Sequence, residues 1–277
     1  MAIAFPKIDP VAFRLEVKWY GIAYGAGFVL GWLYMRKLVQ DAKLWSGNKS
    51  PMTATQVDDF LLWAIFGTVA GGRVGFFLLY EPSVFINQPW VFFMVWKGGM
   101  AFHGGLVGVC LAVIYFARVN RVPLWSLADL CAAVVPIGLF FGRVANFINA
   151  EMYGRLTNVP WAVEFPHEIL ARYGHAFGPR HPTQVYEALL EGLALFLVLF
   201  FLTRWLKTFQ RPGLTAGVFF LGYGAARIFA EFFKEWDMQQ FFTTAYFSAG
   251  MVYSLPMLAF GAYLVWQATQ KQAATAS

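Results

Sequence analysis

Long apolar stretches alternate with short polar connections along this chain of 277 residues. Residues 98–117 contain no Asp, Glu, Lys or Arg, and the same holds for residues 238–270. A helix of about 20 such residues spans the hydrocarbon core of a bilayer. The pattern therefore predicts seven membrane-spanning helices, at residues 19–36, 58–80, 99–118, 125–149, 185–205, 213–234 and 245–267.

Two of the predicted connections are long and rich in aromatic residues. Residues 81–98 contain too many turn formers to span a membrane, and their Trp and Phe side chains favour the membrane interface. We expect an arm that lies along the membrane there. Residues 152–184 contain four prolines and include WAVEFP at 161–166, which predicts a short strand. We expect an ordered outer cap, and a single all-α polytopic domain over residues 1–277.

The composition supports this fold class. Only 13% of the residues are charged, whereas soluble domains carry about 25%. The net charge is +6, but the basic residues mark the ends of apolar runs and form no stripe, so nucleic-acid binding is not expected. Cys110 and Cys131 lie in apolar segments and are interpreted as small core residues. The N-terminus lacks the pattern of a cleaved signal peptide, so the first span is expected to act as the insertion signal.

The positions of lysine and arginine predict the orientation. Basic residues follow the first, third, fifth and seventh predicted helices, at Arg36, Lys37, Lys43, Lys49, Arg118, Arg121, Arg204, Lys207, Arg211 and Lys271. Lys and Arg in short loops favour the cytoplasmic side. The N-terminus is therefore predicted outside and the C-terminus in the cytoplasm.

Eight ionisable residues interrupt the apolar segments. Such residues are costly within a membrane and tend to face a cavity or a partner. They are Arg73, His103, Asp129, Arg143, Glu187, Glu191, Arg227 and Glu231. With the predicted orientation, all except Asp129 fall in the outer halves of their spans, where Tyr20 also lies. Independent helices thus bring cations and carboxylates to one level of the bilayer.

Three arginines at this level favour an anionic ligand, because guanidinium groups match the geometry of phosphate. On a helical wheel Arg143, Asn146, Glu151 and Gly154 share one broad face, provided that the fourth helix continues that far. Arg227 and Glu231 are i, i+4 neighbours. The alternative, that these charges are structural ion pairs which lock helices together, stays open.

His103 is a candidate general base. It lies between Gly99 and the pair Gly104 and Gly105, where the backbone could approach a ligand closely. A buried structural histidine is the alternative. The chain has no HExxH motif, and GTVAGGRVG lacks the lysine of a P-loop. No metal ion, nucleotide or other cofactor is therefore expected.

Several motifs in this order resemble the bacterial prolipoprotein diacylglyceryl transferase family. They are WYG (19–21), GGRVG (71–75), HGGL (103–106), GRVANFINAEMYGR (142–155), RHPTQVYE (180–187) and GYGAARIFAEFF (222–233). The resemblance covers essentially the whole chain. The sequence departs from the family pattern at Lys234, where many members carry arginine.

The resemblance implies a seven-helix enzyme of the bacterial inner membrane that needs no cofactor. It would transfer the diacylglyceryl group of phosphatidylglycerol to the lipobox cysteine of a preprolipoprotein and release glycerol 1-phosphate. By motif, His103, Arg143 and Arg227 match essential family residues. Further functional positions match Tyr20, Asn146, Glu151, Gly154 and Glu231, and we add Arg73, Gly104 and Gly105 as substrate-binding candidates.

Two other classes of function remain as alternatives. A lipid or anion transporter should carry polar groups through to the inner leaflet, where only Asp129 is predicted. It should also show repeated halves, and no internal repeat is found. A non-catalytic lipid-binding scaffold would not require a histidine beside three arginines.

Overall fold

The structure, a computed structural model, describes residues 2–6, 8, 11–13, 17–95, 98–236, 243–244 and 246–276. Contacts divide the chain into two compact units: unit 1 comprises Met1–Tyr34 and Asp129–Ser277, and unit 2 comprises Met35–Ala128. The prediction of one domain over the whole chain stays a prediction.

Helices make up most of unit 1. They are α1 (Trp19–Gln40, whose end belongs to unit 2), α5 (Leu124–Ile148, whose start belongs to unit 2), α7 (Thr183–Glu187), the π-helical segment η5 (Ala188–Ala194), α8 (Leu195–Trp205), η6 (Thr208–Gln210), α9 (Leu214–Glu231) and α10 (Ala249–Ala276). The segments α7, η5 and α8 follow one another without a break, as the prediction of one helix over 185–205 requires. Residue 245, where the last helix was predicted to begin, lies outside the described residues.

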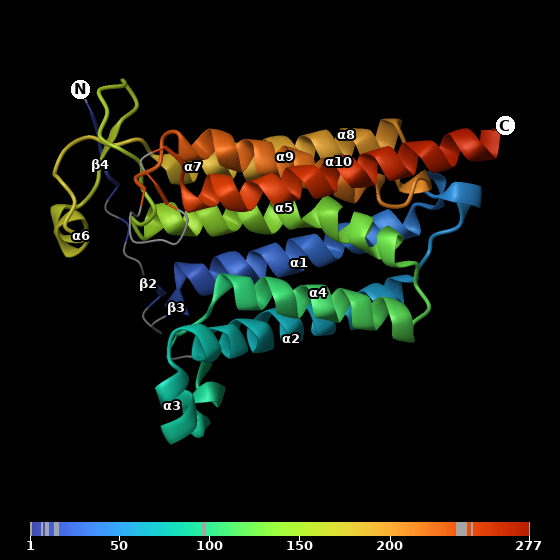
Figure 1. Cartoon of the computed structure of the whole chain (residues 1–277), viewed down its shortest axis with the longest axis horizontal. Helices are drawn as coiled ribbons and strands as arrows, with labels where there is room; N and C mark the ends of the chain where they lie inside the picture. The colour runs from blue at the N-terminus through green and yellow to red at the C-terminus, as the bar shows by residue number, and fades with distance from the viewer. Residues whose placement is uncertain are drawn as a thin grey trace. The chain divides into compact units, whose positions relative to one another are not determined.

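Small residues let the helices of unit 1 pack closely, as is common in membrane proteins. A Cβ on Gly27 of α1 would lie 3.0 Å from the Cα of Gly138 in α5. Similarly, a Cβ on Gly217 of α9 would lie 3.0 Å from the carbonyl oxygen of Gly261 in α10. Figure 1 shows α9 and α10 side by side along their length.

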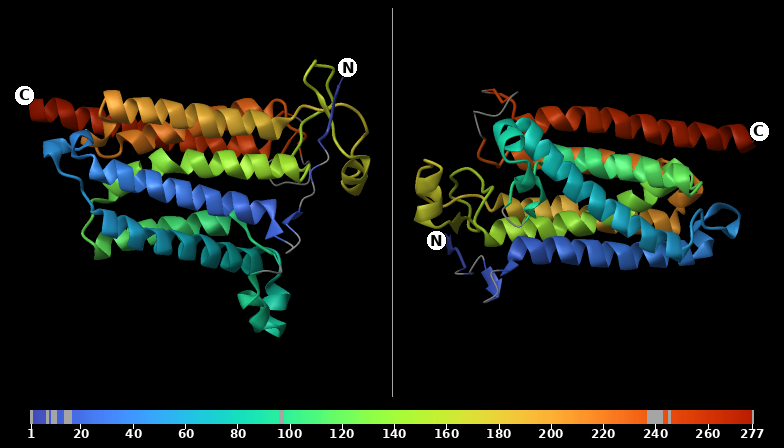
Figure 2. Two further views of the ribbon diagram at one scale, coloured as in Figure 1. Left: turned by 180° about the vertical axis from the view of Figure 1, so that it is seen from behind. Right: turned by 90° about the horizontal axis from the view of Figure 1, so that it is seen from below.

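The cap belongs to unit 1 and has its own small core. Strand β1 (Ile3–Ala4) pairs in parallel with β4 (Val163–Glu164), which confirms the strand predicted within WAVEFP. The buried core of the cap consists of Ala150, Tyr153, Val163, Phe165 and Leu170. Figure 2 shows the segment around α6 (His167–Arg172) beyond the end of α5. A second, antiparallel pair joins β2 (Val11–Phe13) and β3 (Val17–Lys18).

Unit 2 is built on two helices, α2 (Ala54–Leu79) and α4 (Phe102–Val119), which lie side by side (Figure 1). Glycines form their contact: a Cβ on Gly75 would lie 2.7 Å from the Cα of Gly104. The predicted arm contains two short helices, α3 (Pro82–Asn87) and η3 (Pro89–Phe93). Two further turns, η1 (Ala42–Leu44) and η2 (Ser46–Asn48), follow α1.

Helix α2 begins four residues earlier than the apolar pattern predicted, because a capping box defines its start. The hydroxyl of Thr53 accepts a hydrogen bond from the backbone N–H of Gln56 at 3.2 Å, and Gln56 Oε1 accepts one from the N–H of Thr53 at 2.9 Å. These bonds satisfy two backbone donors at the first turn. Polar residues therefore extend the helix beyond its apolar part.

Five helical segments among the described residues are long and apolar enough to cross a membrane. They are Ala54–Leu79, Phe102–Val119, Leu124–Ile148, Thr183–Trp205 and Ala249–Gln270. Helices α1 and α9, with 22 and 18 residues, correspond to the other two predicted spans. The structure thus supports a multi-pass helical membrane protein, and the number of seven crossings stays a prediction.

Candidate functional site

The end of α5 differs from the helical wheel used for the prediction. The helix ends at Ile148, and Ala150 and Met152 take left-handed backbone conformations, with φ of 53° and 58°. The chain turns back there, and the N–H of Glu151 donates to the carbonyl of Asn146 at 3.1 Å. The condition for the shared helical face, that the helix continues to Gly154, is therefore not met. A tight turn, rather than a continued helix, brings Glu151 toward Asn146.

Three of the predicted site residues form a compact hydrogen-bonded group. The hydroxyl of Tyr20 in α1 donates to Glu151, and the amide of Asn146 donates to the Tyr20 oxygen. Asn146 also donates to Glu151 Oε1 at 3.0 Å. Arg143 adjoins this group, since its NH1 lies 3.4 Å from Asn146 Oδ1. Residues separated by more than 120 positions in the sequence thus share one polar site.

Arg143 faces two glutamates from the neighbouring α7–η5 segment. Its Nε lies 3.2 Å from Glu187 Oε2, and its NH2 lies 3.2 Å from Glu191 Oε2. Both carboxylates are fully buried. They lie four positions apart where α7 passes into a π-helix, a local widening that is frequent at functional sites. This helix segment therefore presents two negative charges to Arg143.

Arg227 of α9 contacts the same two glutamates and adds a third. It forms ion pairs with Glu187, with Glu191 at 3.7 Å and with Glu231 at 2.6 Å. The ammonium group of Lys234 lies 3.4 Å from Glu187 and 3.8 Å from Glu231. We call these six residues the ion cluster: Arg143, Glu187, Glu191, Arg227, Glu231 and Lys234. It contains three cations and three carboxylates.

Lys234 reaches the cluster because α9 ends at Glu231, three residues before the predicted end. The chain then pairs with the cap: the N–H of Arg155 donates to the carbonyl of Phe233 at 2.9 Å, and Gly154 pairs with Lys234. A side chain on Gly154 would collide with this carbonyl. The glycine is thus explained by the close crossing of two backbones.

Arg73 has a different environment, in unit 2. It is buried, and its guanidinium group donates only to backbone carbonyls in the contacts described. The acceptors are the carbonyls of Val91, Phe92, Met94, Gly98 and Gly99. These bonds hold the arm against α2. The predicted binding of substrate by Arg73 stays a prediction, and its donors already have protein acceptors.

The other predicted residues of unit 2 begin α4. His103 lies in the first turn and its side chain is exposed. Gly104 lies against Gly75 of α2, so helix packing accounts for the absence of its side chain. Gly105 is less tightly enclosed, with the carbonyl oxygen of Thr68 at 3.4 Å from a Cβ placed there. The role of His103 as a base, and the roles of Gly104 and Gly105 in substrate binding, stay predictions.

Asp129 is a buried carboxylate with backbone partners. Its two oxygens accept hydrogen bonds from the N–H groups of Gly213 and Ala216, both at 2.7 Å. It therefore supplies acceptors for the first turn of α9, which would otherwise leave donors without partners. Asp129 fixes the start of the helix that carries Arg227.

Three members of the ion cluster were not among the predicted site residues. Glu187 and Glu191 were noted as membrane-level carboxylates, yet neither was included among the site residues. Lys234 was noted only as a departure from a family pattern. The signal was present, because fully charged residues in or beside apolar helices need partners. Only the fold identifies which cations those partners are.

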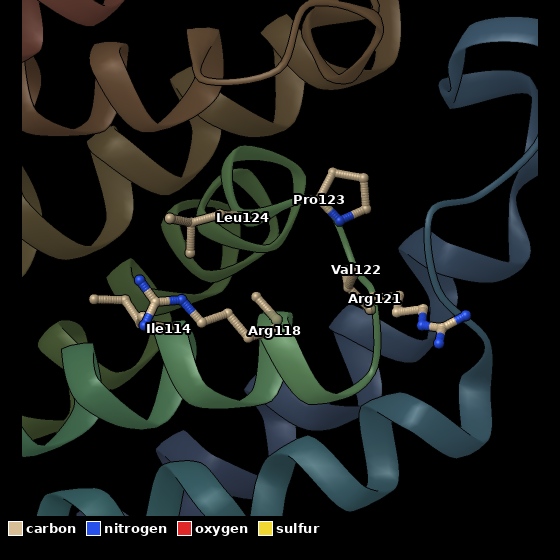
Figure 3. Close-up of a pocket in the computed structure, with 7 residues that line it drawn as sticks. Ile114, Arg118, Arg121, Val122, Pro123 and Leu124 are labelled. Carbon is tan, nitrogen blue, oxygen red and sulfur yellow. The ribbon is translucent and has the colours of Figure 1, made fainter.

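A pocket of about 370 Å³ lies elsewhere, at the turn between α4 and α5 in unit 2. Figure 3 shows Ile114 and Leu124 at this pocket, with the side chains of Arg118 and Arg121 pointing in opposite directions. Its described lining includes none of the predicted site residues. Within the described parts of the chain, no group of three or more His, Cys, Asp or Glu residues is arranged to hold a metal ion.

The fold and the ion cluster define a multi-pass helical membrane protein with a buried charged site. Comparison with known proteins identifies it further. A family model described as prolipoprotein diacylglyceryl transferase matches residues 10–267. The chain belongs to this family, as its motifs predicted.

Curated relatives match nearly the full chain. A protein of Rhizobium meliloti (strain 1021) is 50% identical over 276 residues, which cover 98% of this chain and 96% of the relative. A protein of Brucella ovis is 47% identical over 279 residues, covering 99% and 97%. Both bear the name phosphatidylglycerol–prolipoprotein diacylglyceryl transferase.

Proposed function

We propose that this chain transfers the sn-1,2-diacylglyceryl group of phosphatidylglycerol to the lipobox cysteine of a preprolipoprotein. The C–O bond between the diacylglyceryl carbon and the phosphate breaks, and a C–S bond forms. Glycerol 1-phosphate leaves, and the proton of the thiol passes to a base. This would be the first step of lipoprotein maturation. The observation that carries the proposal is the convergence of Arg143 and Arg227 on one buried carboxylate.

In this proposal Arg143 and Arg227 stabilise the negative charge that develops on the leaving phosphate. Their side chains are 14% and 15% exposed, so the interaction takes place largely away from water, where preorganised charges are most effective. Glu231 orients Arg227 through its ion pair of 2.6 Å. Their guanidinium groups have the planar donor arrangement that phosphate oxygens match.

The group formed by Tyr20, Asn146 and Glu151 offers a hydroxyl, an amide and a carboxylate beside Arg143. These are suitable partners for the hydroxyl groups of a glycerol headgroup. In the proposal they bind the headgroup and hold Arg143 in place. Gly154 lets the backbone of the cap lie close to the segment that carries Lys234.

His103 is proposed as the base that removes the proton of the cysteine thiol. A free thiol has a pKa of about 8.5 and must become a thiolate to attack. Unchanged turnover in His103→Gln at neutral pH would remove His103 from this role. Gly104, Gly105 and Arg73 remain candidate substrate contacts in unit 2.

We further propose seven crossings of the bacterial inner membrane, with the N-terminus in the periplasm and the C-terminus in the cytoplasm. The basic residues after the first, third, fifth and seventh helices support this orientation. The ion cluster would then lie toward the periplasmic leaflet, where both lipid substrate and exported peptide are accessible. Cysteines are introduced one at a time into the cap and the α4–α5 turn of a variant in which Cys110 and Cys131 are replaced by alanine, and their labelling by a membrane-impermeant reagent tests the orientation.

The deciding experiment combines the purified protein, phosphatidylglycerol and a peptide with a lipobox cysteine. We expect equal amounts of released glycerol phosphate and of peptide carrying the diacylglyceryl mass. A peptide with serine in place of cysteine, and phosphatidylcholine in place of phosphatidylglycerol, serve as controls. Absence of both products from the complete mixture would contradict the proposal.

A further inference from the structure

Glu187 is the common partner of every cation in the ion cluster. Its Oε2 lies 3.2 Å from Arg143 Nε. Its Oε1 contacts Arg227 and lies 3.4 Å from the ammonium group of Lys234. The cations come from α5, from α9 and from the segment after α9, so one carboxylate connects three separate parts of unit 1.

Burial restricts the positions that the cations around Glu187 can take. The side chain of Glu187 has no exposed surface, and Lys234 is only 10% exposed. Leaving one partner of a buried ion pair alone is strongly unfavourable, so the cations are held where the carboxylate is. The separation of Arg143 from Arg227 therefore depends on a residue that belongs to neither of their helices.

The contact of Glu187 with Arg143 is an ion pair without a hydrogen bond. Glu187 Oε2 is buried and accepts no hydrogen bond from the residues that the structure describes, although Arg143 lies within ion-pair distance. Such a contact is mainly electrostatic and lacks strict direction. Another anion with suitably placed oxygens can take over the guanidinium donors.

The charge balance adds a second consequence. The cluster already contains as many carboxylates as cations, so the phosphate of a lipid headgroup must compete for cations that have partners. Removing one negative charge from the cluster strengthens its attraction for an anion, most strongly where the dielectric constant is low.

We propose that Glu187 is a positioning residue that sets the spacing of Arg143 and Arg227 and competes with the substrate phosphate for them. This inference rests on the proposed function, because it assigns the phosphate to the ion cluster. Glu187 holds the two guanidinium groups ready for the leaving group, and it gives up part of its contact when phosphate binds.

The test compares Glu187→Gln, which removes the charge but keeps the shape, with Glu187→Asp, which keeps the charge but shortens the side chain. For Glu187→Gln we expect kcat to fall about 100-fold, because the arginines lose their spacing. We expect KM for phosphatidylglycerol, and the inhibition constant of added glycerol 1-phosphate, to fall roughly tenfold because an opposing charge is gone.

For Glu187→Asp we also expect kcat to fall, but KM for phosphatidylglycerol and the inhibition constant of glycerol 1-phosphate should not fall, because the negative charge is kept. Glu164→Gln is the matched control, because Glu164 is an exposed carboxylate of β4 and is not one of the six residues of the ion cluster. It should leave kcat, KM and inhibition unchanged.

Thermal unfolding of each purified variant separates positioning from loss of fold. A purely structural role would lower stability and weaken binding together, so a rise in KM or an unchanged kcat in Glu187→Gln overturns the proposal. An inactive wild-type protein would contradict the proposed transfer itself. Binding of glycerol 1-phosphate, measured by calorimetry without lipid or peptide, would still report whether Glu187 competes with phosphate.

Discussion

Two environments for arginine within apolar helices can be compared in this chain. Arg73 in unit 2 donates to backbone carbonyls of the arm, whereas Arg143 and Arg227 in unit 1 face carboxylates. Both solutions satisfy a guanidinium group in an apolar helix. The two kinds of partner differ in whether an anionic ligand can replace them. Backbone carbonyls carry no net charge and belong to the chain that the arginine holds, whereas carboxylates are themselves anions.

Through its hydrogen bonds to backbone carbonyls, Arg73 holds the arm in place. To bind a ligand, it would have to leave several carbonyls without donors, and buried acceptors without partners are unfavourable. Carboxylate partners are similar to phosphate in charge and in the placement of their oxygens. In the proposed function, Arg143 and Arg227 exchange part of their contact with these carboxylates for the phosphate of the lipid headgroup.

The largest effect is expected from Arg227→Lys and Arg143→Lys. Each variant keeps the charge, yet a single ammonium group cannot replace the planar set of N–H donors by which a guanidinium group contacts two acidic partners. We expect turnover to fall about 10²- to 10³-fold, the range typical of lost charge stabilisation at a reacting oxygen. Initial rates of glycerol phosphate release measure it. Near-normal rates in both variants would contradict a difference in role between these two arginines and Arg73.

Arg73→Ala should act mainly on stability. Removing the guanidinium leaves carbonyls of the arm without donors, at a cost of about 3 kcal/mol. We expect a lower unfolding temperature in detergent and faster proteolysis within residues 82–95, with kcat of the folded fraction reduced much less than in Arg227→Lys. A large loss of kcat at unchanged stability would instead place Arg73 in the substrate site.

Asp129→Asn tests the same rule with the opposite charge. Asp129 has backbone partners, as Arg73 has, so it should also behave as a structural residue. An amide can accept only one of the two hydrogen bonds well, and we expect a loss of about 1 to 2 kcal/mol. Thermal unfolding measures this. Tighter binding of glycerol 1-phosphate in this variant would argue against a purely structural role.

The smallest effect concerns the cap. Burial lowers the pKa of His181 below its ordinary value of 6.5. The unfolded chain therefore binds more protons than the folded one between the two pKa values, so this contribution is complete above pH 6.5 and is lost as the pH falls through the lowered pKa. We expect His181→Gln to make the unfolding temperature slightly less dependent on pH between 5 and 7, within the range where histidine titrates. An unchanged profile would contradict it.

The apolar pattern by itself determined the long helices, because long uncharged runs have few alternatives to a buried or membrane-spanning helix. Each predicted helix overlaps one in the structure, although α10 continues to Ala276, beyond the predicted end at 267. The pattern was less accurate at the ends. The start of α2 depends on Thr53 and Gln56, and the end of α9 depends on pairing with the cap. Local hydrogen bonds of polar residues decide such boundaries, and hydropathy does not report them.

The sequence also identified which charged residues are unusual, since each interrupts an apolar segment at a cost that requires a partner. Only the tertiary structure decided the partners: carbonyls for Arg73, backbone N–H groups for Asp129, and a shared carboxylate for Arg143 and Arg227. Helical periodicity relates residues a few positions apart. The convergence of α5, α7 and α9 on Glu187 depends instead on how helices pack, which acts between residues far apart in the chain.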